Sequence, residues 1–132
     1  MKKLIFAFGA LLALATVSAA NAAEIAVVST TGVNLRAGPG LNYPVVIDLP
    51  AGARMELHGC VAGYAWCDVS WGGNRGWLAS AYMSTIYRNA PVAVTAVAAA
   101  RLGVAIVAFD SGYWRRYYFR RPWFPRWRYY RW

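Results

Sequence analysis

The chain has 132 residues, a formal net charge of +9 and 59% hydrophobic residues. This length allows one small domain with additional segments and leaves no room for a separate hydrolase domain. With one histidine, two cysteines and five acidic residues, the composition also offers little for a catalytic relay or a metal centre.

The first 22 residues have the features of a secretory signal peptide. Two lysines precede an apolar run from Leu4 to Val17, and small residues at 20–22 suit cleavage before Ala23. A permanent N-terminal anchor is the alternative, although the apolar run is short for a bilayer span. We therefore expect an exported protein that is periplasmic or extracellular.

The stretch from Val33 to Gly40 predicts a strand that ends in a sharp turn. Apolar residues at 33, 35 and 37 alternate with polar ones, as in a half-buried strand. Gly38-Pro39-Gly40 cannot continue the ladder, because Pro39 lacks an N–H and glycine tolerates positive φ. The chain is therefore expected to reverse at this point.

Further short strands are expected, each bounded by turn residues. The β-branched run Val45-Val46-Ile47 predicts a buried strand, and Gly72-Gly73-Asn74 predicts a tight turn. Apolar and polar alternation predicts the other strands at 54–59, 66–71 and 75–79, with a helical turn at 80–83. Strands this short and turns this closely spaced are typical of a small barrel.

Several of these motifs, in this order, resemble the bacterial SH3 domain of exported envelope proteins. The resemblance rests on Val33 to Gly40, Tyr43-Pro44-Val45, Leu49-Pro50-Ala51-Gly52, Trp66-Cys67-Asp68-Val69 and Gly76-Trp77-Leu78. It implies an all-β fold, a small SH3-like barrel of about five to seven short strands over residues 25–86. An apolar extended segment (87–110) and an Arg- and aromatic-rich tail (111–132) would follow. One fold hosts many functions, so the resemblance is more specific for fold than for ligand.

Cys60 and Cys67 are expected to form a disulfide, because an exported protein meets oxidising conditions, and free thiols are the alternative. Strict alternation places the two cysteines on opposite faces of their strands. A β-bulge near Gly59 would bring both sulfurs to one side, and glycine often marks such bulges. The sequence therefore predicts a bulge at this position.

Catalytic chemistry is not expected. His58 and Cys60 share one face of a strand and offer the one pairing of a thiol with a base, but a disulfide beside a solvated histidine is the simpler interpretation. The glycines around Pro39 lack the spacing of a phosphate-binding loop. We expect no cofactor and no metal.

Recognition is the more plausible role for the predicted barrel. Tyr43 and Tyr64 are candidate ligand-binding residues because both lie in loops, where binding residues concentrate. Arg36 is a third candidate, although its side chain could instead lie over the barrel and bond to loop carbonyls. Trp66 and Trp77 are interpreted as packing residues.

Residues 90–109 are almost uncharged and approach the length of a membrane span. Arg101 near their centre would cost about 2.5 to 3.5 kcal/mol on insertion scales, which disfavours a transmembrane helix. We expect instead that Val104 to Phe109 is extended and packs on the barrel or on a partner.

Residues 111–132 form a low-complexity tail with seven arginines, eleven aromatic residues and no acidic residue. Pro122 and Pro125 rule out one continuous helix. Arginine binds phosphates and carboxylates through two hydrogen bonds, and Trp and Tyr favour the membrane–water boundary. A disordered tail is the alternative, although disordered segments are usually poor in aromatics. We expect attachment to an anionic surface through Arg115, Arg116, Arg120, Arg121, Trp123, Trp127 and Arg128.

The combined interpretation is a non-catalytic, exported module of the cell envelope. Its expected partner is a cell-wall polymer, peptidoglycan above all, or an envelope protein recognised through a wall-associated peptide. Anionic lipid or lipopolysaccharide is a further partner of the tail. The alternative is a membrane- or lipopolysaccharide-binding protein in which the barrel is only a carrier. Nucleic acid would also attract the tail, but export makes it an unexpected partner.

Overall fold

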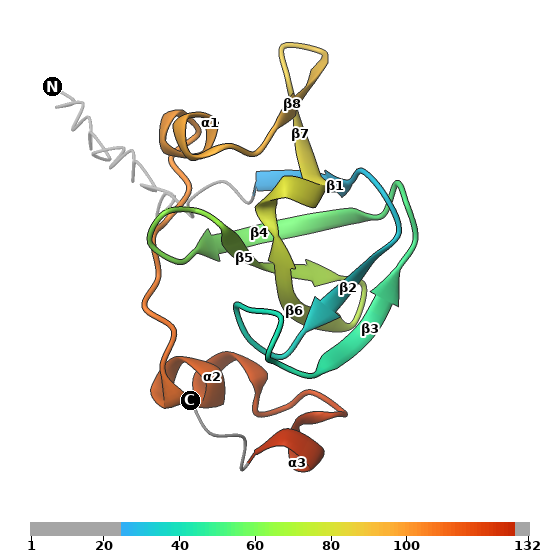
Figure 1. Ribbon diagram of the computed structural model, residues 1–132, viewed down its shortest axis with the longest axis vertical. Coiled ribbons are helices and arrows are strands. Elements are labelled where there is room, and N and C mark those ends of the chain that lie inside the picture. The colour runs from blue at the N-terminus through green and yellow to red at the C-terminus, as the bar shows by residue number, and fades with distance from the viewer. Residues whose placement is uncertain (1–24, 129–132) are drawn as a thin grey trace, which may run out of the picture.

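The computed structural model describes residues 25–128, so the expected signal peptide at 1–22 lies outside the described residues. Within this range the chain forms short strands, a 3₁₀ turn and three short helices (Figure 1). The strands are β1 Ile25–Ser29, β2 Val33–Arg36, β3 Val45–Leu49, β4 Arg54–Cys60, β5 Trp66–Trp71, β6 Asn74–Ala79, β7 Met83–Tyr87 and β8 Ala90–Ala93. The helical elements are η1 Ser80–Tyr82, α1 Ala96–Arg101, α2 Ser111–Tyr118 and α3 Phe124–Trp127.

The described strands form one antiparallel sheet of eight strands in the order β3-β2-β6-β5-β4-β1-β7-β8. This confirms the all-β, SH3-like prediction, including the helical turn after β6. The expected five to seven strands become eight because the chain adds the hairpin β7–β8 beyond η1. The sheet is not closed, since β3 and β8 are its two edges.

The edge position of β3 corrects one prediction. Its β-branched residues were expected to be buried, but Val45 is 37% exposed and Val46 and Ile47 are only half-buried. An edge strand has a neighbour on one side alone, here β2, so its side chains remain partly open to solvent.

The disulfide and the bulge predicted beside it are both present. Cys60 and Cys67 face each other across β4 and β5 and are bonded, with an S–S distance of 2.04 Å. The register of this strand pair shifts between Leu57 and Gly59, where β4 accommodates one extra residue. The bulge resets the alternation, so that both buried sulfurs lie on the same face of the sheet.

The segment after β8 crosses the molecule from one end to the other. It forms α1 beside the β7–β8 hairpin, then runs extended past β4 and β5 to α2 (Figure 1). Cys60 and Ile106 form a parallel β-bridge, in which the Cys60 amide donates to the Ala105 carbonyl at 2.9 Å and the Val107 amide to the Cys60 carbonyl at 2.8 Å. This agrees with the expected extended packing of Val104 to Phe109. Among residues 25–128, no helix is both long enough and apolar enough to span a bilayer.

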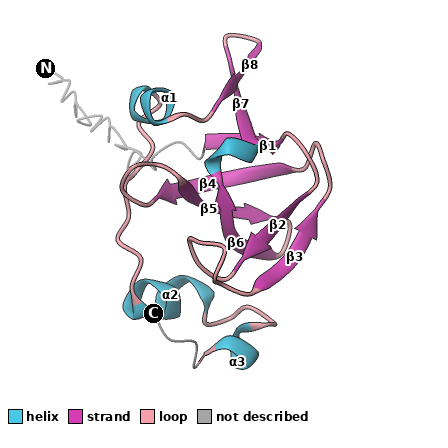
Figure 2. Cartoon of the chain, viewed as in Figure 1, coloured by secondary structure: helices cyan, strands magenta, loops and turns pink. Residues whose placement is uncertain are grey.

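Buried side chains form two clusters, one on each face of the sheet. The first contains Val27, Leu35, Leu57, Val69 and Leu78 with their neighbours. The second joins Trp77 of β6 to aromatic residues of the tail, whose helices lie together against one side of the strands (Figure 2). Its buried members are Ala37, Trp77, Trp114, Tyr118, Trp123 and Phe124.

Candidate functional site

The eight-stranded sheet, residues 25–93, is called the β body below. A groove of about 550 Å³ lies on it where β2, β3, β5, β6 and the turn η1 meet. Its walls combine aromatic rings with polar and charged groups. It is lined by Gly32, Val33, Asn34, Arg36, Leu41, Asp48, Leu49, Trp66, Ala79 and Tyr82. Among the three ligand-binding residues expected from the sequence, Arg36 is the one that lines it.

Arg36 holds the loop that borders this groove. Its guanidinium Nη1 donates to the carbonyl of Leu41 at 3.1 Å and to that of Tyr43 at 2.9 Å. This is the alternative geometry considered for Arg36, a side chain that lies over the barrel and bonds to loop carbonyls. The loop therefore has a fixed shape next to the groove.

Tyr43 and Tyr64 do not line the groove. The ring of Tyr43 covers Gly38, where a Cβ would come within 2.4 Å of the ring, and it meets Phe109 edge-on at 5.5 Å. Tyr64 is half-buried against the first core cluster and has a positive φ of 59°. The structure therefore does not bring the three candidates together in one site.

Two aromatic residues of the groove were not among the expected binding residues. Trp66 had been interpreted as packing, yet its half-buried ring contributes to the groove as well as to the second core cluster. Tyr82 is 46% exposed at the end of η1. Alternation along β5 could have indicated Trp66, because it points away from its buried neighbour Cys67.

Outside the groove, Asp68 on β5 is fully buried, and its carboxylate accepts hydrogen bonds from four donor atoms on the side chains of three residues. Arg75 of β6 forms a fork on it, with Nη2 at 2.7 Å from Oδ2 and Nε at 3.0 Å from Oδ1. The hydroxyls of Tyr113 and Tyr118 donate to Oδ2 and Oδ1, each at 2.5 Å. Alternation puts Asp68 on the same face of β5 as Trp66, and α2 covers that face.

These contacts shift the acid–base properties of the tyrosines and the arginine. Burial, followed by the charge of Asp68, raises the pKa of Tyr118, and the same causes raise the pKa of Tyr113. Burial lowers the pKa of Arg75, but its hydrogen bond to Asp68 and the carboxylate charge raise it by more. Both hydroxyls therefore stay protonated and act as donors at neutral pH.

The tail separates into rings that face inward and arginines that face outward. Arg115, Arg116, Arg120 and Arg128 are exposed, whereas Arg121 is half-buried and donates from Nη1 to the Gly73 carbonyl at 2.9 Å.

Trp123 corrects the expected set of surface residues. It is only 5% exposed because its ring packs against Trp114 and Tyr118, at 6.0 and 5.5 Å between ring centroids. Trp127 is half-buried, and Arg126 lies over its ring at 4.4 Å. The described part of the tail is therefore folded onto the sheet, contrary to the alternative of a disordered end.

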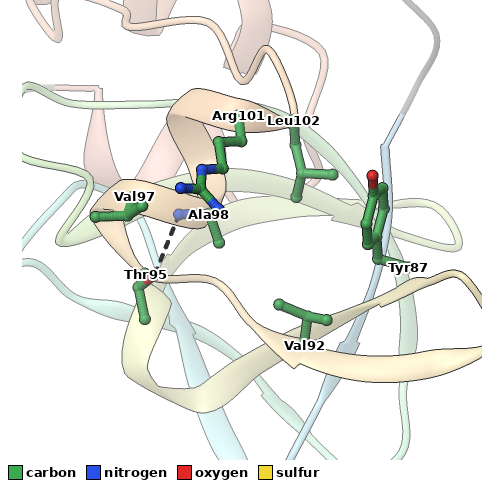
Figure 3. A pocket seen from close by; sticks show the side chains of 7 residues that line it. All are labelled: Tyr87, Val92, Thr95, Val97, Ala98, Arg101 and Leu102. Carbon is green, nitrogen blue, oxygen red and sulfur yellow. Dashed lines mark hydrogen bonds between the residues drawn. The ribbon is translucent and has the colours of Figure 1, made fainter.

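A smaller cavity of about 270 Å³ lies between the β7–β8 hairpin and α1 (Figure 3). Tyr87, Val92 and Leu102 give it an apolar lining, and the Arg101 side chain extends across α1 beside it. Thr95 caps α1 by accepting a hydrogen bond from the Ala98 amide at 3.2 Å. None of the residues expected to bind ligand lies in this cavity.

The residues considered for catalysis are occupied in other ways. Both cysteines are in the disulfide, so neither offers a thiol beside His58. The Nε2 of His58 lies 2.6 Å from the Ser70 hydroxyl of the neighbouring strand. Within residues 25–128, no three His, Cys, Asp or Glu side chains are grouped so that they could hold a metal ion.

Comparison with known proteins identifies the β body. Residues 31–84 match the family described as the bacterial SH3 domain, which confirms the resemblance inferred from the motifs. The uncharacterized protein YraJ of Bacillus subtilis (strain 168) is 31% identical over 83 residues, covering 53% of this chain and 70% of YraJ. No solved structure matches the chain at a significant level. The family match includes every residue of the groove and stops before α1, α2 and α3.

Proposed function

Because this chain belongs to the bacterial SH3 domain family, we propose that it is an exported, non-catalytic module of the cell envelope that binds peptidoglycan or a wall-associated peptide. Members of this family generally bind cell-wall polymers. The disulfide supports export, since such bonds persist in oxidising compartments.

The groove beside Arg36 is the observation that carries this proposal. Trp66 and Tyr82 present aromatic surface in the groove, and Asn34 and Asp48 add polar groups to its lining. A concave site that combines aromatic surface with a few polar groups is typical of a ligand site, and a sugar–peptide polymer offers both kinds of surface in return. We assign the ligand contacts to Arg36, Trp66 and Tyr82, and the expected roles of Tyr43 and Tyr64 stay predictions.

Two tyrosines of similar exposure allow a matched test. Tyr82 lies in the groove and is 46% exposed, and Tyr87 lies outside it and is 49% exposed. We expect Tyr82→Ala to weaken pull-down of the mature protein on purified sacculi about tenfold, as loss of a central aromatic contact does. Tyr87→Ala should bind like the parent.

The outcomes of this test separate the ligand from its site. If both variants bind like the parent, the groove is not the binding site. If the parent itself does not bind sacculi at physiological salt, the wall-binding proposal is wrong. Sacculi that are degraded by the parent but not by a His58→Ala variant would contradict the non-catalytic assignment.

We further propose that the tail attaches the protein to an anionic surface. In the alternative proposal the protein binds only a membrane or lipopolysaccharide, and the β body binds no ligand but carries the tail. The exposed arginines at 115, 116, 120 and 128 favour it. Binding to vesicles that contain anionic lipid or lipopolysaccharide should weaken steeply as salt rises, because surface charges are screened. A protein that binds both vesicles and sacculi supports two separate binding surfaces, the tail and the groove. A protein that binds vesicles but not sacculi supports the carrier alternative.

A further inference from the structure

We propose that the cleft between α2 and α3 binds the phosphate of an anionic lipid headgroup, with Arg115 and Arg128 as its two cationic contacts. The cleft has a volume of about 240 Å³ and is lined by Arg115, Phe119, Phe124 and Arg128. The inference rests on the proposed surface attachment and adds the residues and the ligand chemistry.

The sequence places one arginine and one ring on each side of this cleft. Arg115 and Phe119 are four residues apart at the end of α2, so they share one face of the helix. Phe124 begins α3, and Arg128 directly follows its last residue. The turn between the helices contains Pro122 and folds α3 back, so that both arginines line the same space.

The floor of the cleft is held by the body of the protein. Phe124 is 7% exposed and packs on Trp114, which is 1% exposed, with 4.2 Å between their ring centroids. The indole Nε1 of Trp114 donates to the Ala37 carbonyl at 2.9 Å, and Tyr118 is tied to Asp68. The cleft is therefore formed before any ligand arrives, which lowers the entropy cost of binding.

Charge determines the class of ligand. Residues 111–128 contain six arginines and no acidic residue. Guanidinium groups match phosphate through paired, charge-assisted hydrogen bonds. The cleft therefore offers two such groups to one anion and no opposing carboxylate of its own segment.

Phe119 indicates that the phosphate belongs to a lipid. Its ring is 66% exposed at the rim of the cleft and meets Phe124 edge-on at 5.7 Å. A free phosphate ion would gain nothing from an apolar ring beside the guanidinium groups. A lipid headgroup at a bilayer surface would gain from the ring, because the ring can enter the boundary between headgroups and acyl chains while the arginines hold the phosphate.

Two double variants of equal charge test the cleft. Arg115→Gln with Arg128→Gln removes both cleft arginines, and Arg116→Gln with Arg120→Gln removes two exposed arginines of the same segment that do not line it. Each is measured in the mature protein by cosedimentation with vesicles of phosphatidylcholine and phosphatidylglycerol. We expect a loss of affinity on the order of 30-fold for the cleft pair, because its guanidinium groups lose charge-assisted hydrogen bonds to the phosphate. The control pair contributes only diffuse, salt-screened attraction, so its loss should be at most about threefold.

Equal losses of vesicle affinity for the two pairs would overturn the proposed phosphate site in the cleft and would support attachment by the overall charge of the tail. Absence of vesicle binding by the parent would overturn both the cleft and the attachment. Melting temperatures within a few degrees of the parent's are expected for both pairs, because substitution of an exposed side chain usually changes stability by at most about 0.5 kcal/mol.

A Phe119→Ser variant distinguishes the lipid from a soluble phosphate. We expect it to weaken vesicle binding several-fold while titration with inorganic phosphate, at matched ionic strength, gives the same result as for the parent. If vesicle binding is unchanged by Phe119→Ser, the lipid assignment is wrong.

Discussion

Asp68 links the sheet to the C-terminal segment through a single carboxylate. A buried charge is costly unless it is paired and its remaining lone pairs are bonded. Arg75 supplies the opposite charge from the neighbouring strand, and Tyr113 and Tyr118 supply hydroxyls from α2. Arg75 also lies over the ring of Tyr117 at 4.5 Å. These residues therefore form one unit in which the loss of any member leaves the others incompletely paired.

Asp68→Asn tests this unit. The change keeps the shape of the side chain but leaves the buried guanidinium of Arg75 without its counter-charge, so we expect a loss of about 3 kcal/mol in the free energy of unfolding. Urea denaturation would measure it. Asp48→Asn is the control, because Asp48 is exposed and should change stability by less than about 0.5 kcal/mol. Equal effects of the two changes would contradict the assigned pairing.

The raised pKa values of Tyr113 and Tyr118 predict instability at alkaline pH. Above pH 10, tyrosines of the unfolded chain lose their protons while these two retain theirs, so the native state binds more protons and stability falls as pH rises. Below that pH their contribution is fully present. We expect a decline of up to about 1.4 kcal/mol per pH unit for each tyrosine.

Denaturation at pH 9 to 11 would check this expectation. A variant with both Tyr113→Phe and Tyr118→Phe should start less stable at pH 9 and decline less steeply. The control Tyr117→Phe, on the same helix, should keep the slope of the parent. If the free energy of unfolding of the parent does not change between these pH values, the pKa values of Tyr113 and Tyr118 are not raised in the folded protein.

The residues around Asp68 mark the limit of prediction from sequence. Trp66-Cys67-Asp68-Val69 was recognisable as a motif of the family, and alternation indicates that Asp68 lies on the outer face of β5. Its partners Tyr113 and Tyr118 are 45 and 50 residues away, in a tail whose composition suggested surface contacts. Composition alone could not show that the rings face inward, because that depends on Trp77, whose apolar surface would be open to solvent without the rings that cover it.

Among the elements, the extended segment before α2 depends most on its neighbours. It bonds to Cys60 at the end of β4 and passes close above Gly59. A Cβ on Gly59 would lie 2.8 Å from the Val107 side chain and 3.0 Å from the Ala105 carbonyl oxygen. The glycine therefore serves both the bulge and the close approach of this segment.

Gly59→Ala should destabilise the protein by about 1 to 3 kcal/mol, because the backbone of the segment must move to admit the methyl group. Hydrogen exchange at the Val107 amide should accelerate as its bond to Cys60 weakens. Gly73→Ala is the control, since a Cβ there meets no atom within 4 Å. If Gly59→Ala changes neither the stability nor the hydrogen exchange of the Val107 amide, the extended segment does not pack closely on Gly59.

The bulge was predictable and the hairpin β7–β8 was not. Strict alternation placed the two cysteines on opposite faces, whereas a disulfide requires both on one face, and an extra residue in β4 resolves this conflict. Ala90–Ala93, by contrast, contains Pro91, and proline argues against an internal strand. β8 tolerates it because it is an edge strand of the sheet, a position that only the strand order reveals.

For the whole molecule, the C-terminal helices act as part of the core. They supply Trp114, Tyr118, Trp123 and Phe124 to the cluster that covers Trp77. The family match ends at residue 84, so this cover is added by a segment outside the matched region. Wall binding by the groove and surface attachment by the arginines would then be carried by a single folded unit.

Truncation after Phe109 tests this integration. Removal of α2 and α3 should expose Trp77 and the Asp68–Arg75 pair, so we expect the melting temperature to fall by more than about 10 °C. Binding of a hydrophobic dye should increase, because an apolar patch is uncovered. A truncated chain that melts like the parent and binds no dye would show that the tail is dispensable for stability.

The burial of the indole and phenyl groups in α2 and α3 affects how fragments of this protein should be interpreted. α2 has only eight residues, and an isolated helix that short is unstable in water. In a synthetic peptide copied from this region, rings that normally rest on β6 would be free to enter a bilayer. Such a peptide would adhere to lipid by a route closed to the intact molecule, and its affinity would exceed what the exposed guanidinium groups contribute.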